Sequence, residues 1–195
     1  MIKSNDHLQG KLVTLQPLRE QFFEEYHRMF SPTVRHWLGL PSTADMQVTV
    51  DFLSAALVDE QYYLFYGIFD NQTNKLIGSI VVRSPEYPKG QLGSWLNEHY
   101  WGGGRYQEAL YLALKKYFEL TGSDSIFAYV EEGNVRSLRA HQKGGFVIVD
   151  EAEQERKYLC PGIRAHKLLL TCAAFDAVRK RFEGDCDVSD CKETL

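Results

Sequence analysis

The sequence predicts one mixed α/β domain with a largely antiparallel sheet. Its 195 residues are 44% hydrophobic and 25% charged, which is ordinary for a globular domain. Two apolar runs, residues 62–69 and 76–83, flank the polar stretch Asp70–Lys75, as in an antiparallel hairpin. The expected order is strand, two helices, three strands, helix, strand, helix and two strands. Because hairpins dominate this order, a doubly wound parallel sheet is not expected.

The N-terminal half is expected to begin with a strand and two helices. Residues 11–16 alternate in polarity until Pro17, which favours a strand. Residues 21–30 have helical spacing, and Ser31–Pro32 is expected to end that helix. Ser42, three residues before Asp45, is typical of a cap at the start of the second helix.

The C-terminal half centres on a long helix over residues 105–120, with Ala109, Ala113, Tyr117 and Leu120 in one stripe. Thr121–Gly122 is a typical helix end. The acidic residues 150–155 favour a solvated turn. The remaining expected elements are strands at 91–97, 126–131, 146–149 and 167–171, a short helix at 134–143, and an amphipathic piece over 174–182.

Composition excludes several functional classes. The formal net charge of -4 gives no general attraction for nucleic acid or anionic membrane. No stretch approaches the roughly 20 apolar residues of a membrane span, and the first residues lack the apolar core of a signal peptide. The four cysteines show no zinc-binding spacing and are expected to be free thiols. We therefore expect a cytoplasmic protein with no metal and no nucleic-acid or membrane partner. Residues 1–9 would be an extension, 10–172 the domain, and 173–195 a helix and polar tail.

A glycine-rich segment precedes the long helix. Tyr100-Trp101-Gly102-Gly103-Gly104 runs directly into residues 105–109. Glycine lets the backbone approach a bulky anion, and the first turn of a helix offers unpaired N–H groups and a positive dipole end. Together these features indicate a diphosphate site. An ordinary glycine-rich turn remains the alternative. The segment lacks the Gly-Lys-Ser/Thr ending of a P-loop, and Gln107 stands where the last glycine of G-x-G-x-x-G would fall.

A second segment, residues 134–146, begins with Asn134 and ends with Gly144-Gly145-Phe146. Asn134 has the side chain of a helix N-cap. Gly145 and Phe146 are typical of a helix end followed by a core residue. Each residue has this structural explanation on its own, and the two glycine-containing segments gain weight only when they are considered together.

The two segments resemble the GNAT superfamily of acetyltransferases, and most closely the branch that includes the ribosomal-protein N-terminal acetyltransferases. That branch shows Tyr-Trp-Gly-x-Gly with a later Glu-Ala, here residues 100–104 and 108–109. It also shows Asn-x-x-Ser and Lys-x-Gly-Phe, here Asn134 with Ser137 and residues 143–146. Residues 10–18 are similar to its first strand. The likeness covers roughly residues 10–172 and implies a GNAT-like sheet flanked by helices.

The resemblance implies acetyl-CoA as co-substrate, with no metal, and direct acetyl transfer to a primary amine. The acceptor would be a protein N-terminus, a polyamine, an amino acid or an amino sugar, and a homodimer is possible. A strand that splays from its neighbour would pair with the pantetheine arm, and one of its N–H groups would polarise the thioester. The implied coenzyme-binding residues are Trp95, Leu96, Asn97, Gly102, Gly103, Gly104, Arg105, Tyr106, Gln107 and Asn134.

Three residues are candidates for proton transfer. By resemblance, Ser137 would protonate the departing thiolate. His141 stands where many family members have an acidic tyrosine, and its free pKa near 6.5 suits proton transfer. Glu131 is the first candidate for the base that deprotonates the amine, with Glu132 or a water as alternatives. The structural alternatives are surface glutamates, an exposed histidine on a short helix, and a serine with no role beyond that helix.

Besides His141, the chain departs from the family pattern at two further positions. Tyr106 stands where the phosphate loop usually has a small residue, and Gln91 replaces an acidic residue that could act as a base. These departures leave open a CoA-binding sensor or scaffold without catalysis. Transfer of a different acyl group, such as succinyl, is a further alternative. Cys160 carries no sign of an activated nucleophile, so direct transfer is preferred over a two-step route.

Overall fold

The computed structural model describes residues 6–41, 45–58, 63–83, 91–151 and 164–184. Within these residues, eight strands form one sheet in the order β1-β2-β3-β4-β5-β6-β8-β7. Every neighbouring pair is antiparallel except β5 and β6, which are parallel. The prediction of a mixed domain with a mostly antiparallel sheet is thus confirmed. The strands are β1 Leu8–Gln9, β2 Val13–Pro17, β3 Tyr63–Asp70, β4 Leu76–Arg83, β5 Gln91–Leu96, β6 Ser125–Glu131, β7 Val147–Glu151 and β8 Ala165–Thr171.

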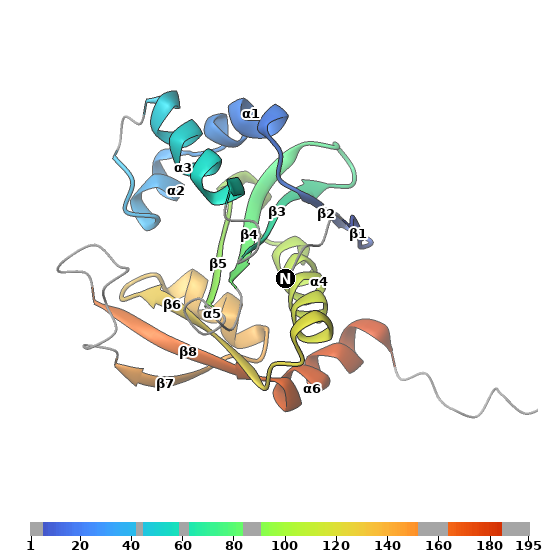
Figure 1. The fold of residues 1–195 in the computed structure, drawn as a ribbon. Helices are drawn as coiled ribbons and strands as arrows, with labels where there is room; N and C mark the ends of the chain where they lie inside the picture. Colours follow the sequence, from blue (N-terminus) through green and yellow to red (C-terminus); the bar gives the residue numbers. More distant parts are fainter. Residues whose placement is uncertain (1–5, 42–44, 59–62, 84–90, 152–163, 185–195) are drawn as a thin grey trace, which may run out of the picture.

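The helices lie in two groups on the sheet. Figure 1 shows α1, α2 and α3 gathered together, apart from α4, which lies near α6. One apolar cluster joins α1–α3 to side chains such as Phe65 and Trp95. The larger cluster joins α4 and α6 to the other face of the sheet. The helices are α1 Phe23–Arg28, α2 Pro32–Trp37, α3 Met46–Val58, α4 Arg105–Thr121, α5 Val135–Lys143 and α6 Cys172–Glu183, with 3-10 turns at Glu20–Phe22 and Glu98–Tyr100.

Helix α4 forms the centre of the larger core. Ala109, Ala113 and Tyr117 are fully buried, as their spacing predicts. Leu120 was expected in the same stripe but is 44% exposed, because it lies in the last turn before the helix ends. Gly122 adopts the left-handed conformation at that end, with φ 60°, as the Thr-Gly pair predicts.

Two local predictions need correction. The predicted helix over residues 21–30 is a 3-10 turn followed by α1, which already ends at Arg28. Ser31–Pro32 begins α2 instead, since the Ser31 hydroxyl accepts a hydrogen bond from the Val34 N–H and proline suits the first helical position. Asp150 and Glu151 extend β7 rather than lying in a turn, and the rest of that acidic stretch lies outside the described residues. The predicted cap Ser42 also lies outside them.

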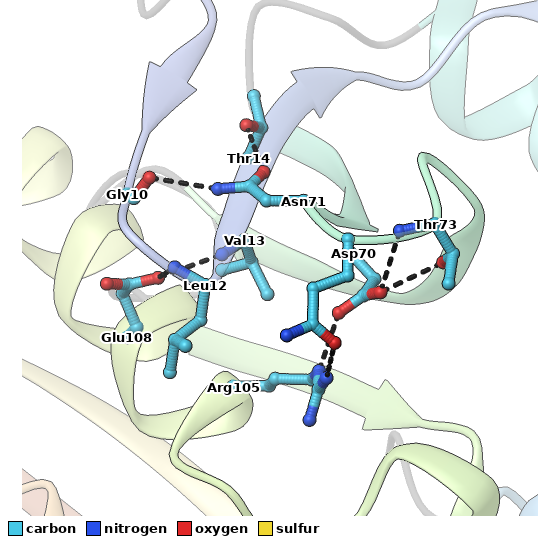
Figure 2. A network of polar contacts seen from close by, with 10 residues as sticks. Gly10, Leu12, Val13, Thr14, Asp70, Asn71, Thr73, Arg105 and Glu108 are labelled. Atoms are coloured by element: carbon cyan, nitrogen blue, oxygen red, sulfur yellow. Dashed lines mark hydrogen bonds and ion pairs between the residues drawn. The ribbon is translucent and has the colours of Figure 1, made fainter.

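The start of the chain is fastened to the first turn of α4, as Figure 2 shows. The Glu108 carboxylate accepts hydrogen bonds from the N–H groups of Lys11, Leu12 and Val13, at 2.8, 2.6 and 2.9 Å. For this reason the first long strand begins at Val13, two residues later than its alternation predicts. Gly10 lies so close that a Cβ there would stand 2.5 Å from a Glu108 oxygen.

A second contact fastens the same turn of α4 to the β3–β4 hairpin. The Nε of Arg105 lies 2.6 Å from an oxygen of Asp70, whose side chain is 1% exposed (Figure 2). Burial alone would raise the pKa of Asp70, but hydrogen bonds from Arg105 and Thr73 outweigh it, so the pKa lies below its usual value. The N-terminus of α4 is therefore held from two sides.

The β4–β5 pair is packed so closely that one glycine is required. At Gly78 a Cβ would stand 2.3 Å from the carbonyl oxygen of Trp95. Gly78→Ala is expected to lower the free energy of unfolding by about 2 kcal/mol, because the two backbones must move apart. Urea unfolding measures the change. Gly93→Ala on β5, where a Cβ has nothing within 4 Å, is the control; equal losses in the two variants would contradict the explanation.

Candidate active site

The glycine-rich segment forms a turn that opens onto the N-terminus of α4. Gly102, Gly103 and Gly104 have φ values of 85°, 62° and 84°, in the left-handed region that favours glycine. The N–H of Glu108 bonds to the carbonyl of Gly104 and is the first donor paired within the helix. The preceding N–H groups and the positive end of the dipole therefore face the turn, as an anion site requires.

Beside this turn, strands β5 and β6 separate. Their parallel pairing covers only Gln91 with Phe127 and Leu92 with Ala128. Strand β5 nevertheless stays paired with β4 as far as Leu96. Beyond Leu92, no strand of the described residues covers the open edge of β5, which is the predicted splay.

The register decides which backbone groups face this gap. The Asn97 N–H bonds to the Ile77 carbonyl on β4, at 2.9 Å. Since antiparallel pairs alternate, Trp95 also directs its N–H toward β4, whereas Ser94 and Leu96 direct theirs into the gap. The Leu96 carbonyl is occupied by the Trp101 indole N–H, at 2.8 Å. Of the three residues predicted for this strand, Trp95, Leu96 and Asn97, only Leu96 therefore directs its N–H into the gap.

A cleft of about 880 Å³ opens at the splay and brings most of the predicted residues together. It extends from the glycine turn and α5 to α2. The predicted residues that line it are Trp95, Leu96, Gly102, Gly103, Gly104, Tyr106, Gln107, Glu131, Asn134, Ser137 and His141.

Two predicted residues lie outside the lining of the cleft. The amide of Asn97 donates to the Met29 carbonyl and its oxygen accepts from the His99 N–H, so its side chain joins elements instead of facing a ligand. The Arg105 side chain turns toward Asp70 (Figure 2), which leaves only its backbone N–H as a candidate donor to the turn.

Helix α5 begins at the predicted cap. The Asn134 side-chain oxygen accepts from the Ser137 N–H at 3.1 Å, which confirms its capping role. That cap fixes the first turn of α5 against the end of β6, since the Asn134 N–H bonds to the Glu131 carbonyl at 3.0 Å. Asn134, Ser137 and Glu131 thus face one cleft from two adjoining elements.

His141 is buried, which corrects the alternative of an exposed histidine. Its side chain is 5% exposed. Its Nδ1 lies 2.9 Å from the Ser137 carbonyl oxygen, which can only accept, so Nδ1 carries the hydrogen in the neutral ring. Nε2 is then an acceptor, and it faces the Tyr106 hydroxyl at 3.4 Å.

Tyr106 connects His141 to the open edge of β5. Its hydroxyl lies 2.8 Å from the Ser94 hydroxyl, and burial raises its pKa to about 12. Because Nε2 of His141 accepts from Tyr106, the Tyr106 oxygen is left to accept from Ser94. The result is a directed chain of hydrogen bonds from the splayed strand to α5.

Burial also lowers the pKa of His141, although its bond to the Ser137 carbonyl partly opposes the shift. A buried neutral histidine with its one N–H committed cannot donate a proton directly to a ligand. It can hold the Tyr106 hydroxyl in place and accept a proton through it.

The depressed pKa predicts a pH-dependent stability. Unfolded His141 titrates near 6.5, so below that pH the unfolded state binds more protons than the folded state. The contribution of His141 is present above pH of about 6.5 and is lost as the pH falls toward its lower folded pKa. We expect the free energy of unfolding of the wild type to fall relative to His141→Asn by up to about 1.4 kcal/mol per pH unit in that range. Urea unfolding across pH tests this, and parallel curves would contradict it.

The two candidate bases differ in their surroundings. Glu131 lines the cleft at the end of β6. Glu132 points to Arg164, with Oε2 and Nε 3.3 Å apart, and does not line the cleft. Glu131 is therefore the better placed of the two.

Among the described residues, no group of three or more His, Cys, Asp or Glu could hold a metal ion, and no helix has both the length and the apolar character of a membrane span.

Sequence reasoning missed several residues of the cleft. Ser94 was not singled out, although period-two alternation along residues 91–96 places it on the same edge as Leu96. The helix α2, which carries Val34 and is followed by Leu38, was missed, because Ser31–Pro32 indicates only a helix end when it is interpreted as a stop. The cations of α5, Arg136, Arg139 and Lys143, also line the cleft.

Comparison with known proteins agrees with this geometry. Residues 13–147 match the family model of the acetyltransferase (GNAT) domain. No protein with a curated description matches the chain in sequence. Among solved structures, a T. thermophilus protein described as an acetyltransferase is 24% identical, with a TM-score of 0.78 over 94% of this chain and 98% of its own.

Two other solved structures share the fold. A GCN5-related N-acetyltransferase from Brucella melitensis is 17% identical, with a TM-score of 0.77 over 93% of this chain and 85% of its own. RimL, a ribosomal-protein alpha-N-acetyltransferase, is 16% identical, with a TM-score of 0.72 over 85% and 94%. At these identities the structures establish the fold alone. With its glycine turn, its splayed strands and a family match that spans most of its length, the chain belongs to the GNAT acetyltransferase family.

Proposed function

We propose that this protein transfers an acetyl group from acetyl-CoA directly to a primary amine. The observation that carries the proposal is the separation of β5 and β6 beside the glycine turn of α4. This arrangement provides a diphosphate site and an open strand edge in one cleft. The residues fit the coenzyme: at Gly102 a Cβ would meet nothing within 4 Å, so the turn is open to a ligand.

When bound, acetyl-CoA supplies an activated acetyl thioester. The N–H groups from Gly102 to Gln107 would bind its diphosphate, and the edge of β5 at Ser94 and Leu96 would bind its pantetheine arm through main-chain hydrogen bonds. The Leu96 N–H, which faces the gap, would polarise the thioester carbonyl. Asn134 would contact the arm from the start of α5.

Proton transfer would use groups from three elements. An alkylamine titrates near 10, so it is mostly protonated at neutral pH and needs a base. Glu131 would take that proton. Ser137 would donate its hydroxyl proton to the departing sulfur and regain one from the nitrogen that has attacked the thioester. The His141 N–H is committed to the Ser137 carbonyl, so His141 would not contact the substrates. Its role would be to position the Tyr106 hydroxyl, which donates to its Nε2. The composition of the chain supports a cytoplasmic setting for this reaction.

Calorimetry with acetyl-CoA and an assay of free thiol released with an amine panel test the proposal. We expect binding, and thiol release that depends on both substrates. Ser137→Ala should lower kcat while acetyl-CoA binding is retained. Binding without thiol release from any amine would reject the transfer reaction and favour a CoA-binding sensor. No heat of association with CoA or its acyl forms would reject both.

A further inference from the structure

We infer that the acceptor is a primary amine that carries one positive charge and an apolar, preferably aromatic, body. The inference rests on the acetyl transfer proposed above and concerns the part of the cleft that α2 and the tryptophans form. It narrows the four acceptor classes that the sequence left open.

The cleft reaches both faces of the sheet. Val34 of α2 belongs to the apolar cluster under α1–α3, and Leu96 belongs to the cluster around α4, yet both line the cleft. The gap between β5 and β6 therefore connects a side with the glycine turn and α5 to a side with α2. An acceptor that enters from the α2 side meets the open edge of β5.

All three tryptophans of the chain, Trp37, Trp95 and Trp101, line this cleft. The indole N–H of Trp95 donates to the Tyr26 hydroxyl at 2.9 Å, and that of Trp101 donates to the Leu96 carbonyl at 2.8 Å. These two rings have committed their polar atoms, so what they offer a ligand is carbon surface, and one face of the Trp101 ring is already covered by the Arg136 guanidinium.

The α2 side is apolar and firmly supported. Val34 lies on α2, and Leu38, which directly follows its last residue, is 39% exposed. Behind the wall, the Trp95 ring packs against Phe30 and Tyr26 at centroid distances of 4.8 and 5.0 Å. A rigid aromatic wall binds an apolar group with little loss of conformational freedom.

The charges of the cleft match one ammonium group. Among the described residues that line it, Glu131 is the only carboxylate, whereas Arg136, Arg139 and Lys143 are cations. One ammonium can pair with Glu131 or lie on an indole face, as the Arg136 guanidinium does 4.1 Å from the Trp101 ring. A second ammonium would find no further carboxylate among these residues, which disfavours polyamines and multiply charged amino sugars.

Tryptophan fluorescence tests the inference without turnover, because every tryptophan of the chain lies in this cleft. The full chain is titrated, with and without CoA, with 2-phenylethylamine, with a short peptide amide that begins with phenylalanine, and with spermidine. We expect at least one aromatic amine to bind about 10-fold or more tightly than spermidine. The better of the two distinguishes a small amine from a peptide N-terminus. Spermidine binding as tight, or no response to either aromatic amine, would overturn the inference.

A charge introduced on the apolar wall provides a second test. Leu38→Asp is expected to bring the affinities for 2-phenylethylamine and spermidine about 10-fold closer together, because it adds a second carboxylate and removes apolar surface. Val48→Asp, at a 52% exposed position of α3 outside the lining, is the matched control. An unchanged ratio in Leu38→Asp would count against the inference.

Thiol release measured in parallel separates this inference from the proposed reaction. Aromatic-amine binding with no thiol release from any amine would reject the acetyl transfer, but it would leave intact the claim that the cleft prefers an amine with an aromatic body. Thiol release supported best by spermidine would reject the inference and leave the acetyl transfer intact.

Discussion

Tyr106→Phe is expected to lower kcat about 100-fold and to change KM for acetyl-CoA less than about 3-fold, since losing one proton-transfer group typically has an effect of this size. The substitution keeps the ring in the cleft and removes the hydroxyl that joins Ser94 to His141. His141 cannot replace that hydroxyl, because it is buried and its N–H is bound to the Ser137 carbonyl. Steady-state kinetics across pH measure the effect, which should include an altered pH profile of kcat.

Tyr111→Phe is the matched control for this variant. Tyr111 lies on the same helix, but its hydroxyl donates to Glu183 at 2.6 Å and it does not line the cleft. An equal loss of kcat in the two variants would show a general structural effect. A rise in KM alone for Tyr106→Phe would show that the hydroxyl serves coenzyme binding and not proton transfer.

Glu108→Ala should lower the free energy of unfolding by about 3 kcal/mol or more and weaken the binding of acetyl-CoA. The substitution removes the acceptor of three backbone N–H groups at residues 11–13. A buried donor left without a partner costs about 1–3 kcal/mol, although water can reach part of this turn. The loss is large beside the total stability of a domain, about 5–15 kcal/mol. Urea unfolding and calorimetry measure the two effects.

Glu119→Ala, at an exposed position of the same helix, controls for the removal of a carboxylate from α4. Glu108→Gln gives a finer comparison, because its amide oxygen can still accept from Leu12 and Val13 while its NH2 group, a donor, faces the Lys11 N–H. We expect its stability to lie between those of the wild type and the alanine variant. A Glu108→Ala protein as stable as the Glu119→Ala protein would contradict the account of this contact.

Local signals in the sequence predicted much of the fold correctly. The Asp70–Lys75 turn between two apolar runs predicts the β3–β4 hairpin, and Gly122 predicts the end of α4. Asn134 predicts the cap of α5. In each case the interacting residues lie only a few positions apart, so the sequence pattern includes all of the residues that form the turn, the cap or the helix end. The same holds for the glycine turn, whose conformation depends on consecutive residues.

Other features depend on contacts between distant segments. The hydrogen-bonded chain joins Ser94 of β5, Tyr106 of α4 and His141 of α5. Because these residues lie far apart in the sequence, no local pattern predicts that their side chains meet. Tyr106 looked like an obstruction in a phosphate loop, whereas its ring turns inward to a histidine. The direction of the Leu96 N–H can be deduced only from the register of β5 with β4, which the sequence does not give. Ser31–Pro32 carries the signals of both a helix end and a helix start, and the structure shows that it starts α2, whereas α1 ends earlier, at Arg28.

Through the Glu108 carboxylate, the backbone of residues 11–13 is fixed to the first turn of α4, so the two segments should move together. A ligand that orders the glycine turn should therefore slow amide hydrogen exchange at Lys11, Leu12 and Val13, although none of them lines the cleft. The dependence is reciprocal. Substitutions at Gly10 or Leu12, which lie outside the cleft, should therefore change the affinity for such a ligand.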